Sequence, residues 1–212
     1  MSAREEILSR LREATSDIST PLGHRGPVPV IQVDSPGAEE TLELFAENVA
    51  DYRATVVRCG PGEVGTVVAE ALARAGSRSV VVPHGLDAGW VSAAHDAGVE
   101  LRSDEQLDAY GLDVVDAVVT ASRVGIATTG TIVLDHAEDQ GRRALSLVPD
   151  QHVCVIRADQ VVHDVPAAVA VLDPHRPLTW ISGPSATSDI ELDRVEGVHG
   201  PRTLDVIIVE GG

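Results

Sequence analysis

Lysine is absent from this chain of 212 residues, because all 16 of its cationic side chains are arginine. That absence excludes a Schiff-base lysine, a lysine general base and the lysine of a phosphate-binding loop. The 33 carboxylates outnumber the arginines and give a net charge of −17, and the chain has only five aromatic residues. Nucleic-acid binding is therefore not expected, since it needs a basic face and usually aromatic stacking platforms.

Cysteine is also scarce, with Cys59 and Cys154 alone in apolar runs. The chain by itself holds neither a four-cysteine iron–sulfur cluster nor a cysteine-rich zinc site. We expect two small buried thiols; a disulfide between them stays open, although a cytosolic location argues against it. No metal site is predicted, because the eight histidines are scattered and H-E-x-x-H is missing. The nearest approaches to ligand pairs, predicted to be exposed turns, are Asp135-His136 and His163-Asp164.

Long apolar runs are missing as well, and none approaches the ~20 residues of a membrane span. The amino-terminal residues alternate in charge sign, which is unlike a signal peptide. With 43% hydrophobic and 23% charged residues, the chain is expected to be globular, without a membrane span, and cytoplasmic.

Helical and strand patterns alternate along the chain. A helix at 2–15 and a connector at 17–37 are followed by a helix at 38–52. Further helices are predicted at 64–75, 88–97 and 164–172. Strands are predicted at 54–59, 79–82, 99–101, 114–120, 131–134, 144–148, 153–156, 178–182 and 204–209. Continuous Val/Ile runs joined by helices predict an α/β fold with a mostly parallel sheet flanked by helices. The helix-poor section at 124–157 predicts antiparallel pairs inserted in, or appended to, that sheet.

Ligands of such sheets usually bind beyond the carboxyl ends of the strands. One candidate loop, Gly60-Pro-Gly-Glu-Val-Gly65, follows a predicted strand and opens a helix, as a dinucleotide site would. However, Pro61 removes a backbone donor, and the acidic residue expected at the end of the next strand is missing. A tight turn is the competing interpretation, and the cofactor stays unknown.

A second candidate loop runs from Ser182 to Glu191 and is rich in hydroxyls. Its backbone amides and hydroxyls suit a carboxylate or phosphate. Alternatively, the serines and threonines only cap a helix, for which Ser188 and Glu191 fit a capping box. The turn Thr129-Gly130-Thr131 is either a ligand contact or a simple hairpin turn.

Two further segments carry cations or an imidazole. His199, Gly200 and Arg202 fall in a turn before the last strand, and Arg143 follows another arginine. Each segment has the charge or donors to bind an anion, and each is also typical of an ordinary solvated surface turn.

The motifs in combination resemble one known family. They are Thr129-Gly-Thr-Ile-Val-Leu134, Arg143-Ala-Leu-Ser-Leu-Val-Pro149 followed by His152-Val-Cys-Val155, and Ser182-Gly-Pro-Ser-Ala-Thr-Ser-Asp-Ile-Glu191 with Gly197-Val-His-Gly-Pro201. Together they resemble the lactate utilization protein C family, also called the LUD domain family. The resemblance is dense from about 114 to 212 and looser before that.

The resemblance implies a fold like that of the glucosamine-phosphate deaminase, ribose-phosphate isomerase and CoA-transferase group. It implies that residues 1–52 form a helical segment and connector that pack on the core, and that residues 53–212 form the LUD domain. It also implies a cluster-free component of L-lactate oxidation to pyruvate, acting with an iron–sulfur protein. The family often has Glu before the T-G-T turn, where this chain has Thr128, so a glutamyl intermediate has no carboxylate there.

These considerations predict His152 and His199 as proton carriers, since histidine titrates near neutral pH. The predicted ligand-binding residues are Thr129, Gly130, Thr131, Arg143, Ser182, Gly183, Pro184, Ser185, Ala186, Thr187, Ser188, Asp189, Glu191, Gly200 and Arg202. An oxidoreductase subunit, a stand-alone enzyme acting on a phosphorylated sugar, CoA ester or folate, and a non-catalytic scaffold all stay open. Fold analogy alone favours the second of these.

Overall fold

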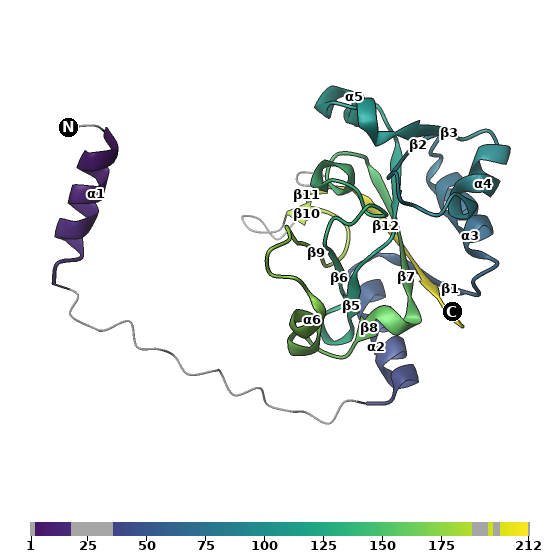
Figure 1. Ribbon diagram of the computed structural model, residues 1–212. Helices are drawn as coiled ribbons and strands as arrows, with labels where there is room; N and C mark the ends of the chain where they lie inside the picture. The colour runs from purple at the N-terminus through teal and green to yellow at the C-terminus, as the bar shows by residue number, and fades with distance from the viewer. Residues whose placement is uncertain (1–2, 18–35, 188–194, 197–199, 212) are drawn as a thin grey trace. The chain divides into compact units, whose positions relative to one another are not determined.

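The computed structural model describes residues 3–17, 36–187, 195–196 and 200–211, and the chain divides into two compact units, Met1–Val33 and Asp34–Gly212. In the first unit, helix α1 (Ala3–Ala14) matches the helix predicted for 2–15 (Figure 1). Glutamates occupy its first turn and Arg12 its last turn, which suits the helix dipole. None of its described residues is buried.

The second unit is built on a six-stranded sheet in which every neighbouring pair is parallel, in the order β1-β12-β7-β4-β2-β3. The central strands are Val/Ile-rich and buried on both faces, which is what a covered parallel sheet requires. The predicted parallel sheet is therefore confirmed. The strands are β1 (Thr55–Cys59), β2 (Ser79–Val82), β3 (Glu100–Ser103), β4 (Ala117–Thr120), β7 (Gln151–Arg157) and β12 (Thr203–Val209).

Helices α3 (Val64–Ala75) and α4 (Gly89–Asp96) cover one face of this sheet (Figure 1). The two helices approach closely at Gly65, where a Cβ atom would lie 2.6 Å from the carbonyl oxygen of Gly89. The last glycine of the G-x-G-x-x-G loop thus has a packing role. A short helix, α5 (Ala109–Asp113), precedes β4.

A second sheet of four short strands covers the other face together with helix α2 (Ala38–Asp51). Its order is β8-β5-β6-β9, with β6 antiparallel to both neighbours, so the predicted antiparallel section is confirmed. Ile132 and Leu134 of β6 pack toward the parallel sheet, whereas Val133 packs with Ala168 of α6 (Val165–Val171). The strands are β5 (Val124–Ile126), β6 (Thr131–Leu134), β8 (Val161–Val162) and β9 (Thr179–Ile181).

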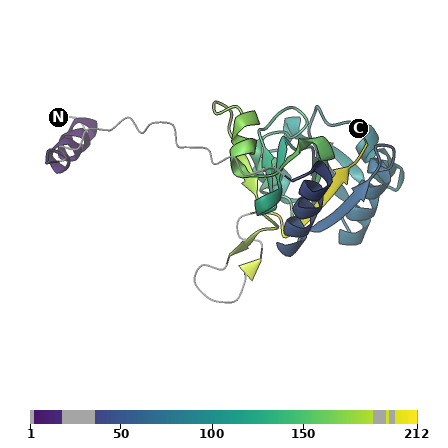
Figure 2. The same cartoon turned by 90° about the horizontal axis from the view of Figure 1, so that it is seen from below.

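Two predicted strands differ in the structure. The strand predicted at 144–148 is wrong, because Arg143–Ser146 forms a 3-10 turn, η3, that buries Leu145 and ends shortly before Pro149. The strand predicted at 114–120 begins only at Ala117. After Gly183, the two-residue strands β10 (Ala186–Thr187) and β11 (Val195–Glu196) pair antiparallel, and Figure 2 shows them standing away from the two sheets. The helix start predicted from Ser188 and Glu191 lies outside the described residues.

The remaining short 3-10 turns are η1 (Asp104–Gln106), η2 (Ala127–Thr129) and η4 (Ala158–Gln160). Among the described residues, no helix combines the length and apolar character needed to cross a bilayer.

Candidate functional site

A cavity of about 290 Å³ lies between the parallel sheet and the second sheet. We call it the hydroxyl cavity, because the side chains of Ser146, Thr179, Ser182 and Ser185 line it. Its other lining residues are Leu147, His152, Trp180, Ile181, Gly183, Pro184, Gly200, Pro201 and Leu204. The described side chains that line the cavity are all uncharged at neutral pH, including His152.

The cavity does not follow the carboxyl ends of the parallel strands, where the ligand loops were expected. His152 and Leu204 are instead the second residues of β7 and β12. The reason is topological: the loop 182–185 follows β9, which belongs to the second sheet.

The two hydroxyl-rich stretches predicted to act together do meet in the structure. Strands β6 and β9 are antiparallel neighbours, with Ile132 opposite Ile181. This pairing places the Oγ1 atom of Thr131 at 2.8 Å from Oγ of Ser182, and Thr129 donates its hydroxyl to Thr131 at 2.8 Å. Ser182 lines the cavity. The Thr131 hydroxyl bonds the Ser182 hydroxyl, and Thr129 in turn bonds Thr131.

Both turns that carry these residues need glycine. Gly130 has φ +55°, and a Cβ atom there would lie 2.6 Å from the carbonyl carbon of Asn48 in α2. Gly183 has φ +81°, and its Cβ atom would lie 2.6 Å from Cβ of Tyr52, the residue that caps α2. Positive φ and close backbone approach both favour glycine. The carboxyl-terminal end of α2 therefore sets the position of both turns.

The loop at Gly183–Ser185 is joined to the segment that precedes β12. The amide of Ser185 donates to the carbonyl of Pro201 at 2.8 Å, and Gly200 lies against the Ser185 side chain. One of the amides predicted to hold an anion is thus occupied by the protein itself.

His152 is the one ionisable side chain that lines the hydroxyl cavity among the described residues. It is 1% exposed, and its Nε2 atom lies 2.8 Å from the hydroxyl of Thr120. Burial lowers the pKa of His152 to about 4, because desolvation penalises the charged imidazolium. The prediction that His152 carries a proton near neutral pH therefore does not fit its surroundings.

Thr120 connects His152 to a buried thiol. The Thr120 hydroxyl lies 3.9 Å from Sγ of Cys154, and this thiol lies 3.9 Å from the carbonyl oxygen of Ala121. Burial raises the pKa of Cys154 to about 12, so the thiol stays protonated. Cys59 and Cys154 are both free and buried, as predicted.

Several predicted site residues lie elsewhere. Arg143 lines a separate cavity of about 610 Å³, and Arg202 lines a third, of about 500 Å³, where it lies 3.6 Å from Asp150. Ala186 and Thr187 form β10. The positions of Ser188, Asp189, Glu191 and His199 lie outside the described residues.

Sequence patterns did not indicate Thr120, Ser146 or Thr179 as site residues. Thr120 carried the best signal, as a hydroxyl at the end of an otherwise apolar buried strand. His136 likewise departs from the exposed turn predicted for it. Its ring nitrogens bond the carbonyl of Gly141 and the hydroxyl of Thr179, each at 2.9 Å.

Metal and dinucleotide chemistry gain no support from the described geometry. The described residues contain no cluster of three or more His, Cys, Asp or Glu side chains suited to a metal ion. In the G-x-G-x-x-G loop, the Glu63 carboxylate accepts the amide of Gly60 at 2.8 Å. This carboxylate takes a donor that a pyrophosphate would use and would repel its charge.

Comparisons with known proteins agree on one family. Residues 42–209 match the family model described as the LUD domain. The chain is 49% identical over 174 residues to "Lactate utilization protein C" of Deinococcus radiodurans, and the aligned region covers 80% of each chain. It is 26% identical to the protein of the same name from Anoxybacillus flavithermus, over 97% of this chain and 96% of that one.

A solved structure has the same fold. The crystal structure of a DUF162 family protein from Deinococcus radiodurans matches with a TM-score of 0.69 and 42% identity. The match covers 82% of this chain and 99% of that chain. The family match, the named relatives and the shared fold agree: the chain belongs to the LUD domain family.

Proposed function

We propose that this protein is a component of a lactate utilization system that oxidises L-lactate to pyruvate, and that its hydroxyl cavity binds a small 2-hydroxy or 2-oxo carboxylate. The observation that carries the first part is the 49% identity to a protein named for lactate utilization, over 80% of both chains. A role in lactate utilization also agrees with the other relatives of that name.

The size and chemistry of the cavity support the second part. At about 290 Å³, it is at the small end of ligand pockets and suits a molecule of a few heavy atoms. When Thr131 donates to Ser182, the Ser182 hydroxyl keeps its own proton to donate to a carboxylate. No acidic side chain of a described residue lines the cavity and would repel that carboxylate. Trp180 and Leu204 supply an apolar wall for the carbon skeleton.

His152 is suited to orient the 2-hydroxyl group of lactate. With Cys154 donating to Ala121 and Thr120 donating to Cys154, the hydroxyl of Thr120 accepts the Nε2 proton of His152. The Nδ1 atom then keeps a lone pair that accepts a hydrogen bond from the ligand hydroxyl. Because the ring has a pKa of about 4, it positions this hydroxyl and does not take up a second proton at neutral pH.

Oxidation of lactate also needs an acceptor for two electrons. The chain has two cysteines, both free and buried, so a four-cysteine iron–sulfur cluster belongs to another chain. We propose an iron–sulfur protein as the partner that receives the electrons, in line with the family resemblance.

Growth on L-lactate tests the proposal. Deleting the gene is expected to abolish growth on L-lactate and to leave growth on pyruvate intact. The wild-type gene is expected to restore growth, whereas a Ser182→Ala/Ser185→Ala double variant is expected to restore it poorly. Unimpaired growth of the deletion strain on L-lactate would refute the role.

The same strains separate the competing functions. Full rescue by the double variant would refute the cavity's role and favour a scaffold that only binds the partner. Purification of the protein without any cluster-containing protein, from cells grown on L-lactate, would favour a stand-alone enzyme.

A further inference from the structure

We infer that the cavity of about 610 Å³ beside strands β2 and β3 is a second ligand site, which binds the phosphate or carboxylate group of a small molecule through Arg143. We call it the arginine cavity, because Arg142, Arg143 and Arg176 line it. Nothing in this inference depends on lactate being the ligand of the hydroxyl cavity.

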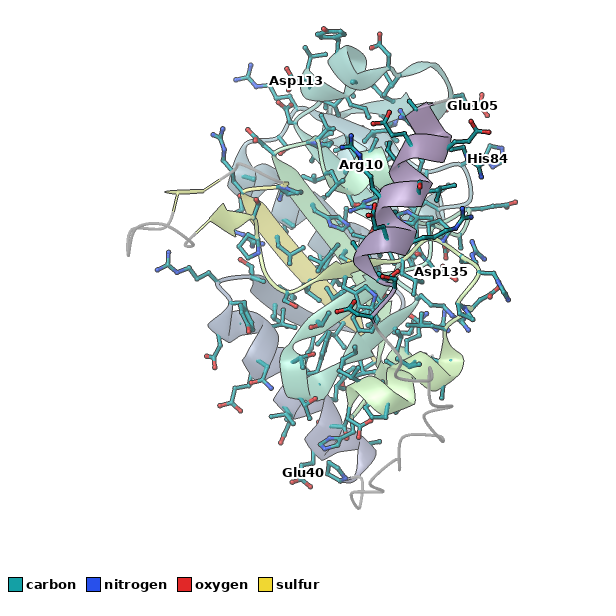
Figure 3. All side chains as sticks on the ribbon, turned by 90° about the vertical axis from the view of Figure 1, so that its left-hand side faces the viewer. Arg10, Glu40, His84, Glu105, Asp113 and Asp135 are labelled. Carbon is teal, nitrogen blue, oxygen red and sulfur yellow. The ribbon has the colours of Figure 1, made fainter. Side chains whose placement is uncertain are left out.

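The arginine cavity lies at the carboxyl ends of two parallel strands. Its walls include Pro83 and His84, which follow β2, and Ser103–Glu105 at the end of β3. Carboxyl ends of parallel strands are where open α/β sheets bind ligands. The side chains of His84 and Glu105 lie along one edge of the face seen in Figure 3.

Close packing and hydrogen bonds fix the loops that form the cavity. The amide of Gly85 donates to the carbonyl of Glu138 at 3.0 Å, and a Cβ atom on Gly85 would lie 2.6 Å from Cβ of Glu138. Gly141 has φ +68°, and its Cβ atom would lie 2.5 Å from Leu145. The segment that carries Arg142 and Arg143 is therefore fixed before any ligand binds, which lowers the entropic cost of binding.

The three arginines of this cavity differ in whether they have partners. The Nε atom of Arg142 donates to both carboxylate oxygens of Asp104, at 2.9 and 3.0 Å. Arg176 donates to the backbone carbonyl of Asp135 and lies 3.7 Å from its carboxylate. The guanidinium of Arg143 forms no ion pair or hydrogen bond with any described residue, in a chain with twice as many carboxylates as arginines.

Besides Asp104, which is paired with Arg142, the acidic side chains of Glu105 and Glu138 line this cavity. Both are exposed, so solvent and salt screen them from a ligand on Arg143. Arginine binds planar oxyanions through two parallel N–H donors, which is the chemistry left unused at Arg143.

The two cavities share a wall. The turn η3 supplies Arg143 to the arginine cavity and Ser146 to the hydroxyl cavity. His136 lines the arginine cavity and bonds Thr179, which lines the hydroxyl cavity. A test must therefore distinguish which cavity takes the probe.

Calorimetric titration of the full chain with inorganic phosphate, and separately with succinate, tests the inference. Binding of at least one probe is expected, and Arg143→Ala is expected to weaken it tenfold or more. Arg202→Ala removes a guanidinium from a different cavity and is expected to leave affinity within twofold, as is Ser182→Ala in the hydroxyl cavity. The probe that binds more tightly identifies the oxyanion.

Arg143 is exposed, so its replacement is expected to leave the melting temperature unchanged, and a loss of binding then reports the site itself. Failure of both probes to bind, or equal affinity of Arg143→Ala and wild type, would overturn the inference. Loss of binding in Ser182→Ala instead would place the probe in the hydroxyl cavity and would overturn it as well.

Discussion

At the scale of single residues, His152 shows how burial changes chemistry. A histidine at this position looks like a proton carrier in the sequence, because its ordinary pKa lies near neutrality. In the fold it is 1% exposed, with Nε2 bonded to Thr120, and it remains neutral. The sequence predicts the strand at 153–156, directly after His152. It does not show that the second sheet covers His152, and this burial sets the protonation state of the ring.

The lowered pKa of His152 makes stability depend on pH. Its folded pKa of about 4 lies below the ordinary value of 6.5, so between those values the unfolded chain binds the extra proton. Folding stability is therefore lost as pH falls through this window, by on the order of 3 kcal/mol in total. Urea unfolding at about pH 7 and about pH 5 measures the larger part of this loss, about 2 kcal/mol.

The carboxylates titrate too, so the matched comparison is His152→Gln. This variant is expected to lose less stability than the wild type between the two pH values. An equal loss in both proteins would mean that His152 does not titrate with the lowered pKa.

At the scale of elements, the turn between η2 and β6 links the second sheet to α2. Gly130 takes φ +55° directly against the backbone of Asn48, whose side-chain amide donates to the carbonyl of Ala127 at 2.8 Å. The glycine in T-G-T is recognisable from the sequence as a turn. Its contact with a helix some eighty residues earlier is not, because no local pattern encodes that packing.

Gly130→Ala is expected to destabilise the fold by on the order of 2–4 kcal/mol, since it adds left-handed strain to a steric overlap. Gly76 is the matched control, because it has φ +75° but nothing within 4 Å of the position that a methyl group would take. Gly76→Ala is expected to cost only about 1 kcal/mol. Denaturant unfolding of both variants checks this, and equal losses would show that packing against α2 contributes nothing.

Element prediction failed where a short apolar run had no strand partner. Residues 144–148 alternate weakly and precede Pro149, and they overlap η3, which brings Ser146 to one cavity and Arg143 to the other. Periodicity cannot separate a short strand from a turn that buries one leucine. The long Val/Ile runs at β7 and β12 were predicted well because both faces of those strands are buried.

At the scale of the whole molecule, the two sheets decide which motifs meet. The sequence predicts that 129–131 and 182–189 act together, and the β6–β9 pairing brings Thr131 and Ser182 within hydrogen-bonding distance, while 188–189 lie outside the described residues. It also grouped Arg143 and Arg202 with them, but these arginines line two other cavities. Which residues share a cavity depends on strand order, and strand order is not visible in local patterns.

Binding of a small 2-hydroxy or 2-oxo carboxylate in the hydroxyl cavity, as proposed above, can be measured directly. Trp180 lines this cavity and is 43% exposed, so its fluorescence reports occupancy. Titration with L-lactate or pyruvate is expected to give a saturable change that disappears in Trp180→Phe and that needs at least tenfold more ligand in Ser182→Ala. A signal unchanged by either ligand, or identical affinities in Ser182→Ala and the wild type, would contradict the account.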